Sequence, residues 1–195
     1  MPYKSNISYG KEIDIIPNRE ISNILDKINN LIFTENDLLI EELNKNIIFD
    51  KNSKIVYVED ISKIINLDNF ILYLERVLDK IVYKPEDYHL SSKELHIRWK
   101  NCNVIPPHQD NFYHCFSSEE SFKVLVPLTN ASKDSGYLNW AKVSHNQIVL
   151  RHAASSIEAF SSYIPSSELV DLPIQWNSFV LHPGDISWHS INSIH

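Results

Sequence analysis

The spacing of apolar residues divides the chain into a helical first part and a β-rich second part. Apolar residues recur every three to four positions over residues 18–33 and again over residues 66–82, which predicts two amphipathic helices. A shorter helix is predicted over residues 35–44, and residues 47–50 and 54–58 flank a short polar turn and predict a hairpin. Because no histidine precedes residue 89, we interpret these helices as a packing layer and not as a site.

The apolar pattern changes after Pro85 to short runs separated by turn residues, which is typical of an all-β barrel or sandwich. Residues 94–100 alternate between apolar and polar side chains, as a half-buried strand does. Residues 145–167 are rich in serine and alanine and are interpreted as a helix or a lid. Further strands are predicted over residues 122–128, from Tyr137, over residues 174–181 and over residues 186–195.

No repeat, linker or low-complexity segment divides the 195 residues, which are enough to bury a substantial core. We therefore predict a single domain over residues 1–195. Residues 1–85 form its mainly helical layer, and residues 86–195 form its β-rich core.

The composition is that of an ordinary globular protein and excludes several classes. The net charge is −7 and no basic cluster is present, which argues against a nucleic-acid partner. No apolar run approaches the roughly 18 residues that a membrane helix needs, and residues 1–9 lack the apolar core of a signal peptide. Cys102 and Cys115 are too few for a disulfide framework, so a cytoplasmic protein with two free thiols is expected.

The candidate chemistry lies in the second half, because all nine histidines fall between His89 and His195. The segment VIPPHQDNFYH contains His108 and Asp110, which would point to the same face of a β-strand. An imidazole and a carboxylate side by side are two-thirds of the facial triad that binds a metal and leaves its other positions open. A third ligand would come from a distant strand. His189 and His195 both qualify and have the same strand parity, so periodicity does not choose between them.

Three segments in order resemble the phytanoyl-CoA dioxygenase-like family of Fe(II)/2-oxoglutarate-dependent oxygenases, over roughly residues 85–195. They are VIPPHQDNFYH, FKVLVPLTNASKDSGYLNWAKVSH and LHPGDISWHSINSIH. In this family the distal histidine follows the aspartate of a Gly-Asp pair by about ten residues, which here leads from Asp185 to His195. The resemblance therefore implies His108, Asp110 and His195 as the metal ligands.

The resemblance also implies a fold and an activity. The expected fold class is mainly β with N-terminal helices, and its core is a double-stranded β-helix (a jelly roll or cupin-like barrel) with the helices packed on one face. The expected cofactor is Fe(II), with 2-oxoglutarate as cosubstrate and O₂ as oxidant. The expected reaction is hydroxylation of a small molecule, with succinate and CO₂ as co-products. The carboxylate of Asp110 sets the chain apart from the halogenating branch, in which a small residue stands at this position.

Relatives place an arginine about ten residues beyond the distal histidine, where it pairs with the far carboxylate of 2-oxoglutarate. No residue follows His195 in this sequence, so either the natural chain continues or another cation replaces the arginine. Arg98 and Lys100, on the polar face of a predicted strand, are the candidates for binding 2-oxoglutarate. Residues expected to contact the substrate are Tyr113, His114 and Arg151.

Two other hypotheses remain open at the level of sequence. One is a cupin-like enzyme that holds Zn²⁺ or Mn²⁺ on the same three ligands and does not use 2-oxoglutarate. The other is a binding module that kept the barrel and lost both catalysis and the cosubstrate clamp. The absence of lysine and arginine after Arg151 favours these two, whereas the segments around both ligand positions favour the oxygenase.

Overall fold

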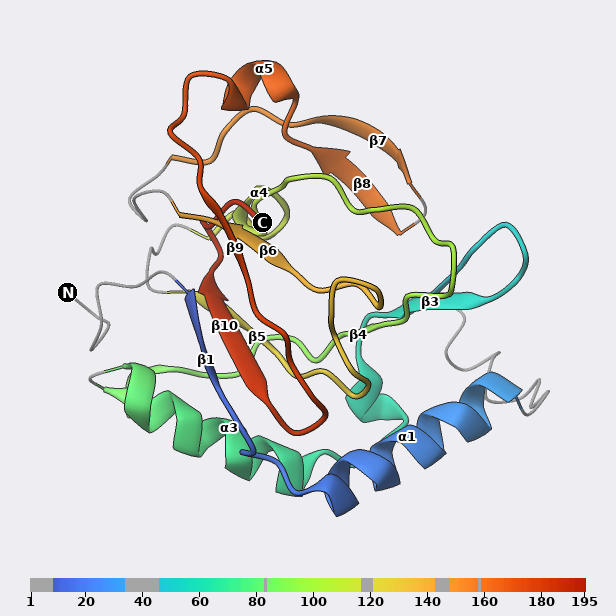
Figure 1. The fold of residues 1–195 in the computed structure, drawn as a ribbon. Helices are drawn as coiled ribbons and strands as arrows, with labels where there is room; N and C mark the ends of the chain where they lie inside the picture. The colour runs from blue at the N-terminus through green and yellow to red at the C-terminus, as the bar shows by residue number, and fades with distance from the viewer. Residues whose placement is uncertain (1–8, 34–45, 83, 117–120, 143–147, 158) are drawn as a thin grey trace.

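The computed structural model describes residues 9–33, 46–82, 84–116, 121–142, 148–157 and 159–195 (Figure 1). The helices are α1 (Asn18–Phe33), α3 (Asp68–Ile81), α4 (Asn111–His114) and α5 (Ser166–Leu169), with 3₁₀ turns η1 (Ile61–Lys63) and η2 (Pro85–Asp87). The strands are β1 (Tyr9–Glu12), β2 (Ile47–Phe49), β3 (Ile55–Val58), β4 (Leu95–His96), β5 (Phe122–Leu125), β6 (Asn139–Ala141), β7 (Ala153–Ile157), β8 (Phe160–Tyr163), β9 (Trp176–Ser178) and β10 (Ile186–Ser190). The paired strands among these are antiparallel, and the class is mostly β with few helices, as expected.

One sheet, in the order β1-β10-β5, organises the rest of the molecule. Side chains of β10 alternate between its two faces. Ile186 and Trp188 join the hydrophobic cluster beneath the sheet, whereas Ser187 and His189 are buried on the opposite face. The register places Lys123 of β5 directly across from His189. The sheet therefore separates an apolar face from a face that carries polar and ionisable side chains.

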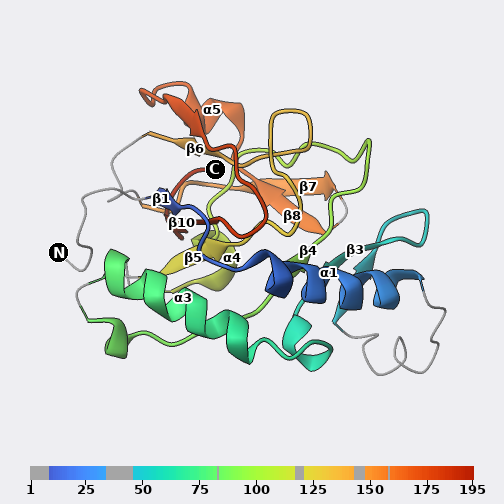
Figure 2. The ribbon, with the colours of Figure 1, turned by 60° about the horizontal axis from the view of Figure 1, so that its bottom comes forward.

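The helices α1 and α3 lie along the apolar face of this sheet (Figures 1 and 2). Ile21 of α1 and Val77 and Ile81 of α3 are buried against Ile186. Each such side chain contributes about 1.5–3 kcal/mol by leaving water. The helix predicted over residues 18–33 is confirmed at the same bounds, and that predicted over 66–82 is confirmed as α3. The helix predicted over residues 35–44 lies outside the described residues.

A second cluster lies between the other end of α1 and the sheet β2-β3-β4. It contains Ile24, Ile28 and Leu31 of α1 together with Ile47, Ile55 and Val58 of the hairpin. The predicted hairpin is confirmed, with Ile47 opposite Val58. The apolar face of α1 thus contributes side chains to both hydrophobic clusters.

Two predicted strands end early at turns, and one segment predicted as a helix or lid contains strands instead. The strand expected over residues 94–100 is limited to β4, because the chain turns at Trp99–Cys102, where the Cys102 N–H donates to the Trp99 carbonyl. The last strand ends at Ser190 rather than continuing to residue 195, since the Ser193 N–H turns back to the Ser190 carbonyl at 2.9 Å. The described part of residues 145–167 contains a hairpin of β7 and β8 that leads into α5, and not the helix that was one of the two alternatives.

None of the helices in the described part of the chain is both long and apolar enough to cross a membrane.

Candidate metal centre

His108, Asp110 and His195 come together in the structure, each offering one ligand atom, and these atoms lie within 4.8 Å of one another. His108 Nε2 is 3.8 Å from Asp110 Oδ1, and His195 Nε2 is 3.7 Å from Asp110 Oδ2. The centroids of the two imidazoles are 4.1 Å apart. We call these three residues the triad.

The triad is not built on a strand, as the sequence interpretation supposed. His108 lies in an irregular segment after Pro106 and Pro107, and Asp110 has helical backbone angles (φ −59°, ψ −32°) at the start of α4. The Asn111 N–H, in the first turn of α4, donates to the Ile191 carbonyl at 2.9 Å. The segment is therefore held against residues 191–195 by long-range hydrogen bonds instead of by a sheet.

Gln109, between the two ligands, ties three segments together and is fully buried. Its Nε2 donates to the Asn192 carbonyl at 2.8 Å, and its Oε1 accepts from the Leu150 N–H at 2.8 Å. Its own backbone N–H donates to His152 Nε2 at 3.2 Å. The sequence analysis missed this residue, because nothing in its local pattern distinguishes a buried cross-linking glutamine from an exposed one.

His189 lies beside the triad without being one of its members. Its Nε2 is 3.0 Å from Asp110 Oδ2 and donates to that carboxylate, and its ring is 4.2 Å from that of His195. The side chain is 1% exposed, and its Nδ1 has no hydrogen-bond partner among the described residues. The group of side chains that could hold a metal therefore contains His195 and not His189, and His189 hydrogen-bonds to its Asp110 carboxylate.

The histidines of the triad have the form that a metal requires. Burial lowers the pKa of His108 to about 3, with a further contribution from the neighbouring His195. Burial also lowers the pKa of His195 to about 4, assisted by His189. Both rings are therefore neutral at neutral pH, and a neutral imidazole is the form that donates a lone pair to a metal.

Asp110 is ionised despite its burial. Burial alone would raise its pKa, but the nearby His195 ring, the hydrogen bond from His189 and the charge of Lys123 together hold the pKa well below its ordinary value. The site thus presents two neutral imidazoles and one carboxylate, the donor set of a facial triad for a divalent first-row metal.

Both triad histidines are oriented by backbone carbonyls. His108 Nδ1 is 3.2 Å from the Pro106 carbonyl, and His195 Nδ1 is 3.1 Å from the Ser193 carbonyl. A hydrogen bond at Nδ1 places the proton there and leaves the Nε2 lone pair free. The residues present therefore fit a metal ion bound through both Nε2 atoms and Asp110.

Lys123 is a cation at the site that the sequence analysis did not identify. Its Nζ lies 3.6 Å from Asp110 Oδ1 and 3.1 Å from Glu94 Oε2. Burial would lower the pKa of Lys123, but Asp110 and Glu94 outweigh burial and raise it. The hydrogen bond with His96, together with Lys123, holds the pKa of Glu94 at about 2. Lys123 and Glu94 are consequently a charged pair at the edge of the triad.

Arg98 and Lys100, the expected 2-oxoglutarate ligands, are both exposed. The Arg98 guanidinium donates to the Asn103 carbonyl within its own turn. Among the described residues, no hydrogen bond or ion pair connects either side chain to the triad. We expected Arg98 and Lys100 to point into the barrel because side chains alternate along a strand. β4 ends at His96, so this alternation does not extend to either residue.

Of the three residues expected to contact substrate, Tyr113 lies beside the triad. The Tyr113 ring lies 6.3 Å from the His108 ring, and its hydroxyl donates to the Ser162 carbonyl at 2.8 Å. His114 stacks on Phe116 at 5.4 Å, and Arg151 is exposed. Phe160 approaches His108 more closely, at 4.6 Å in an edge-to-face arrangement. Tyr113 and Phe160 together form an aromatic wall beside His108.

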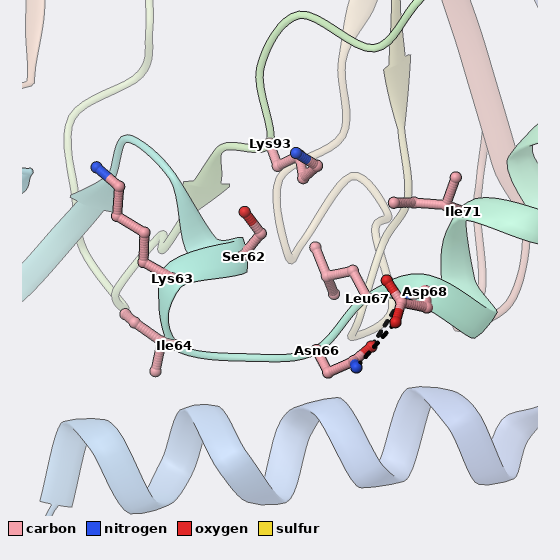
Figure 3. A pocket seen from close by; sticks show the side chains of 8 residues that line it. All are labelled: Ser62, Lys63, Ile64, Asn66, Leu67, Asp68, Ile71 and Lys93. Carbon is pink, nitrogen blue, oxygen red and sulfur yellow. Dashed lines mark hydrogen bonds between the residues drawn. The ribbon is translucent and has the colours of Figure 1, made fainter.

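A surface hollow of about 510 Å³ lies elsewhere, between η1, the start of α3 and the loop before β4 (Figure 3). Its lining includes Lys63, Asn66, Asp68 and Lys93 and none of the triad residues. Asn66 and Asp68 face each other there, and Asn66 Nδ2 donates to the Asp68 carboxylate at 3.0 Å. The hollow contains no set of side chains comparable to the triad.

The sequence matches no family model and no curated protein. Among solved structures, it is similar to the epimerase SnoN in complex with Fe³⁺, α-ketoglutarate and nogalamycin RO, with a TM-score of 0.63 and 15% identity over 97% of this chain and 72% of that one. It is also similar to a structure of the non-heme α-ketoglutarate-dependent epimerase SnoN from nogalamycin biosynthesis, with a TM-score of 0.59 and 15% identity over 97% of this chain and 70% of that one. The resemblance to the phytanoyl-CoA dioxygenase-like family stays a prediction. At this level of identity the likeness establishes architecture, and this chain has the fold of these non-heme enzymes.

Proposed function

We propose that the protein is a non-heme Fe(II) oxygenase that uses 2-oxoglutarate (α-ketoglutarate) and O₂ to oxidise a small molecule. The observation that carries the proposal is the convergence of His108, Asp110 and His195 with their metal-binding atoms within 4.8 Å of one another. The fold shared with SnoN, whose structure holds Fe³⁺ and α-ketoglutarate, supports this choice of metal and cosubstrate. The phytanoyl-CoA dioxygenase-like family and a double-stranded β-helix belong to the same proposal.

In this proposal the protein supplies two neutral donors and one anionic donor to the metal. His108 and His195 bind the metal through Nε2, and Asp110 binds it through its carboxylate while His189 holds Oδ2. Iron with 2-oxoglutarate and O₂ supplies an oxidant for a substrate C–H bond, with succinate and CO₂ as co-products. Tyr113 and Phe160 provide an apolar surface beside His108, which suits a substrate with a hydrophobic or aromatic part.

Hydroxylation is the proposed outcome, and epimerisation is the second candidate because both solved structures named above are epimerases. The two outcomes differ in the product. Hydroxylation adds one oxygen atom from O₂ to the substrate. Epimerisation inverts the configuration at one carbon and leaves the mass of the substrate unchanged. Mass spectrometry of a converted substrate in ¹⁸O₂ separates them.

The proposed function is tested by loading the protein with Fe(II) and measuring succinate formed from 2-oxoglutarate in air. We expect succinate from the wild type and at least a hundredfold less from Asp110→Ala, which removes one of three ligands. Asp134→Ala, at an exposed aspartate, is the matched control and should behave as the wild type. Binding of Zn²⁺ or Mn²⁺ without any use of 2-oxoglutarate would instead favour a cupin-like enzyme. Failure to bind any metal would favour a binding module.

A further inference from the structure

Lys123 places an ammonium group beside the triad. Its strand β5 directs Phe122 and Val124 toward α1 and α3, so Lys123 points to the opposite face of the sheet, as its cross-strand partner His189 does. Its side chain is 30% exposed, and its Nζ is 3.6 Å from Asp110. Among the described lysines and arginines, only Lys123 has a recorded ion pair with a member of the triad.

The charges around Lys123 change when a divalent metal binds. The Lys123 ammonium is shared between Asp110 and Glu94. A metal on Asp110 would lie about 2 Å beyond the carboxylate oxygen, so that the ammonium and a dication would face each other at short range. An anionic group between the two cations relieves this repulsion. The site therefore favours a ligand that is anionic both at the metal and at some distance from it.

Glu94 keeps Lys123 at this position. Its carboxylate accepts from Lys123 at 3.1 Å, lies 3.2 Å from His96 Nε2 and accepts from the Ser92 hydroxyl at 3.3 Å. A carboxylate held by three neighbours is a fixed anchor. It allows the ammonium to leave Asp110 for an incoming anion without losing its other partner.

We propose that Lys123 binds the far carboxylate of 2-oxoglutarate and that Glu94 is the positioning residue for Lys123. This inference rests on the proposed function. It assigns to Lys123 of β5 a role that the sequence predicted for Arg98, Lys100 or an arginine beyond His195. An ammonium makes a single-point contact with a carboxylate, in contrast to the bidentate contact of an arginine.

The test compares two 2-oxo acids that bind the metal alike. 2-Oxoglutarate carries the far carboxylate, and 2-oxobutyrate lacks it. Dissociation constants are measured without O₂ on Mn(II)-loaded protein by calorimetry, with Mn(II) affinity determined separately for each variant. The variants are Lys123→Met and Lys123→Arg, with Lys133→Met, at an exposed lysine, as the matched control.

We expect Lys123→Met to weaken 2-oxoglutarate binding roughly tenfold to a hundredfold, as for loss of a hydrogen bond to a charged group. Its affinity for 2-oxobutyrate should change less than about twofold, Lys123→Arg should retain part of the selectivity, and Lys133→Met should match the wild type. Equal losses for both acids would show that Lys123 acts through Asp110, and no loss for either would show that it does not contact the cosubstrate. Either result overturns the inference, as would a selective loss in Arg98→Met or Lys100→Met with Lys123→Met unaffected. Mn(II) binding by a wild type with no affinity for 2-oxoglutarate would overturn the proposed function itself.

Discussion

The backbones of His108 and His195 hydrogen-bond to each other in both directions. The His108 N–H donates to the His195 carbonyl at 2.9 Å, and the His195 N–H donates to the His108 carbonyl at 3.0 Å. Each ring then directs Nδ1 to the carbonyl two residues earlier in the chain, that of Pro106 or Ser193. The two ligands are therefore placed by the same local arrangement on either side of one backbone bridge.

The first prediction separates a ligand from a positioning residue. His195→Ala should abolish binding of Co(II), followed by its visible absorption, because it removes one of three donors. His189→Asn should retain the site and lose roughly ten- to a hundredfold in affinity, as is typical when a group that orients a ligand is removed. If His189→Asn abolished binding and His195→Ala did not, the assignment of the third ligand would be reversed.

The second prediction concerns the stability of the metal-free protein at mildly acidic pH. The pKa values of His108 and His195 in the folded protein are lowered from 6.5 to about 3 and about 4. Below pH 6.5 the unfolded chain therefore takes up protons that the folded site resists, and stability must fall as the pH is lowered. We expect a loss on the order of 1 kcal/mol per histidine between pH 6.5 and 5.5.

This loss is measured by urea unfolding in EDTA at several pH values. His108→Asn removes one of the two groups and should give a shallower dependence on pH. A wild-type stability that stays constant across this range would contradict the burial of two neutral imidazoles.

The third prediction concerns Gln109 as a structural cross-link. Gln109→Leu preserves the approximate volume but leaves the Leu150 N–H and the Asn192 carbonyl without their partner. We expect a loss of about 2–6 kcal/mol in the free energy of unfolding, at about 1–3 kcal/mol for each of the two groups left unsatisfied. Gln175→Leu, at an exposed glutamine, is the matched control and should change stability by less than about 0.5 kcal/mol. Equal effects of the two substitutions would show that the Gln109 network contributes little.

The fourth prediction compares two glycines with positive φ. Gly184 (φ +97°) and Gly136 (φ +81°) both adopt a conformation that strains other residues, but a Cβ at Gly184 would lie 2.5 Å from the Ile16 carbonyl oxygen, whereas one at Gly136 meets no atom within 4 Å. Gly184→Ala should cost on the order of 3 kcal/mol and Gly136→Ala about 1 kcal/mol. Chemical denaturation of both variants checks this order, and a larger effect at Gly136 would contradict the close approach at Gly184.

The sequence predicted best those elements that are specified by the spacing of apolar residues within a short segment. The apolar stripe over residues 18–33 specifies α1, because the same spacing supplies Ile21 to one core and Ile24 and Ile28 to the other. The ends of β4 and β10 were not predictable in this way. Each is set by a turn whose backbone hydrogen bond competes with strand pairing, and alternation of side chains continues past such a turn in the sequence.

The composition of the candidate site was easier to predict than its geometry. The residues His108 and Asp110 were chosen because a strand would place them on one face, but the structure brings them together through a turn into α4. The sequence shows the two-residue spacing of His108 and Asp110. It does not show the backbone hydrogen bonds between His108 and His195, because these join distant parts of the chain. The orientation of Lys123 could have been predicted from the sequence. In a strand, a lysine between Phe122 and Val124 points to the opposite face from them, away from the helices.

The central position of β10 in its sheet has a consequence for how the protein is synthesised. β1 is near one end of the described chain and β10 near the other, so β1 and β5 leave the ribosome long before the strand that lies between them. Until then both have unpaired backbone groups that other chains can bind. The pairing joins residues far apart in sequence, and such contacts form slowly because a long loop must close first. We therefore expect the interval between synthesis of β5 and of β10 to be a time at which this chain is exposed to aggregation.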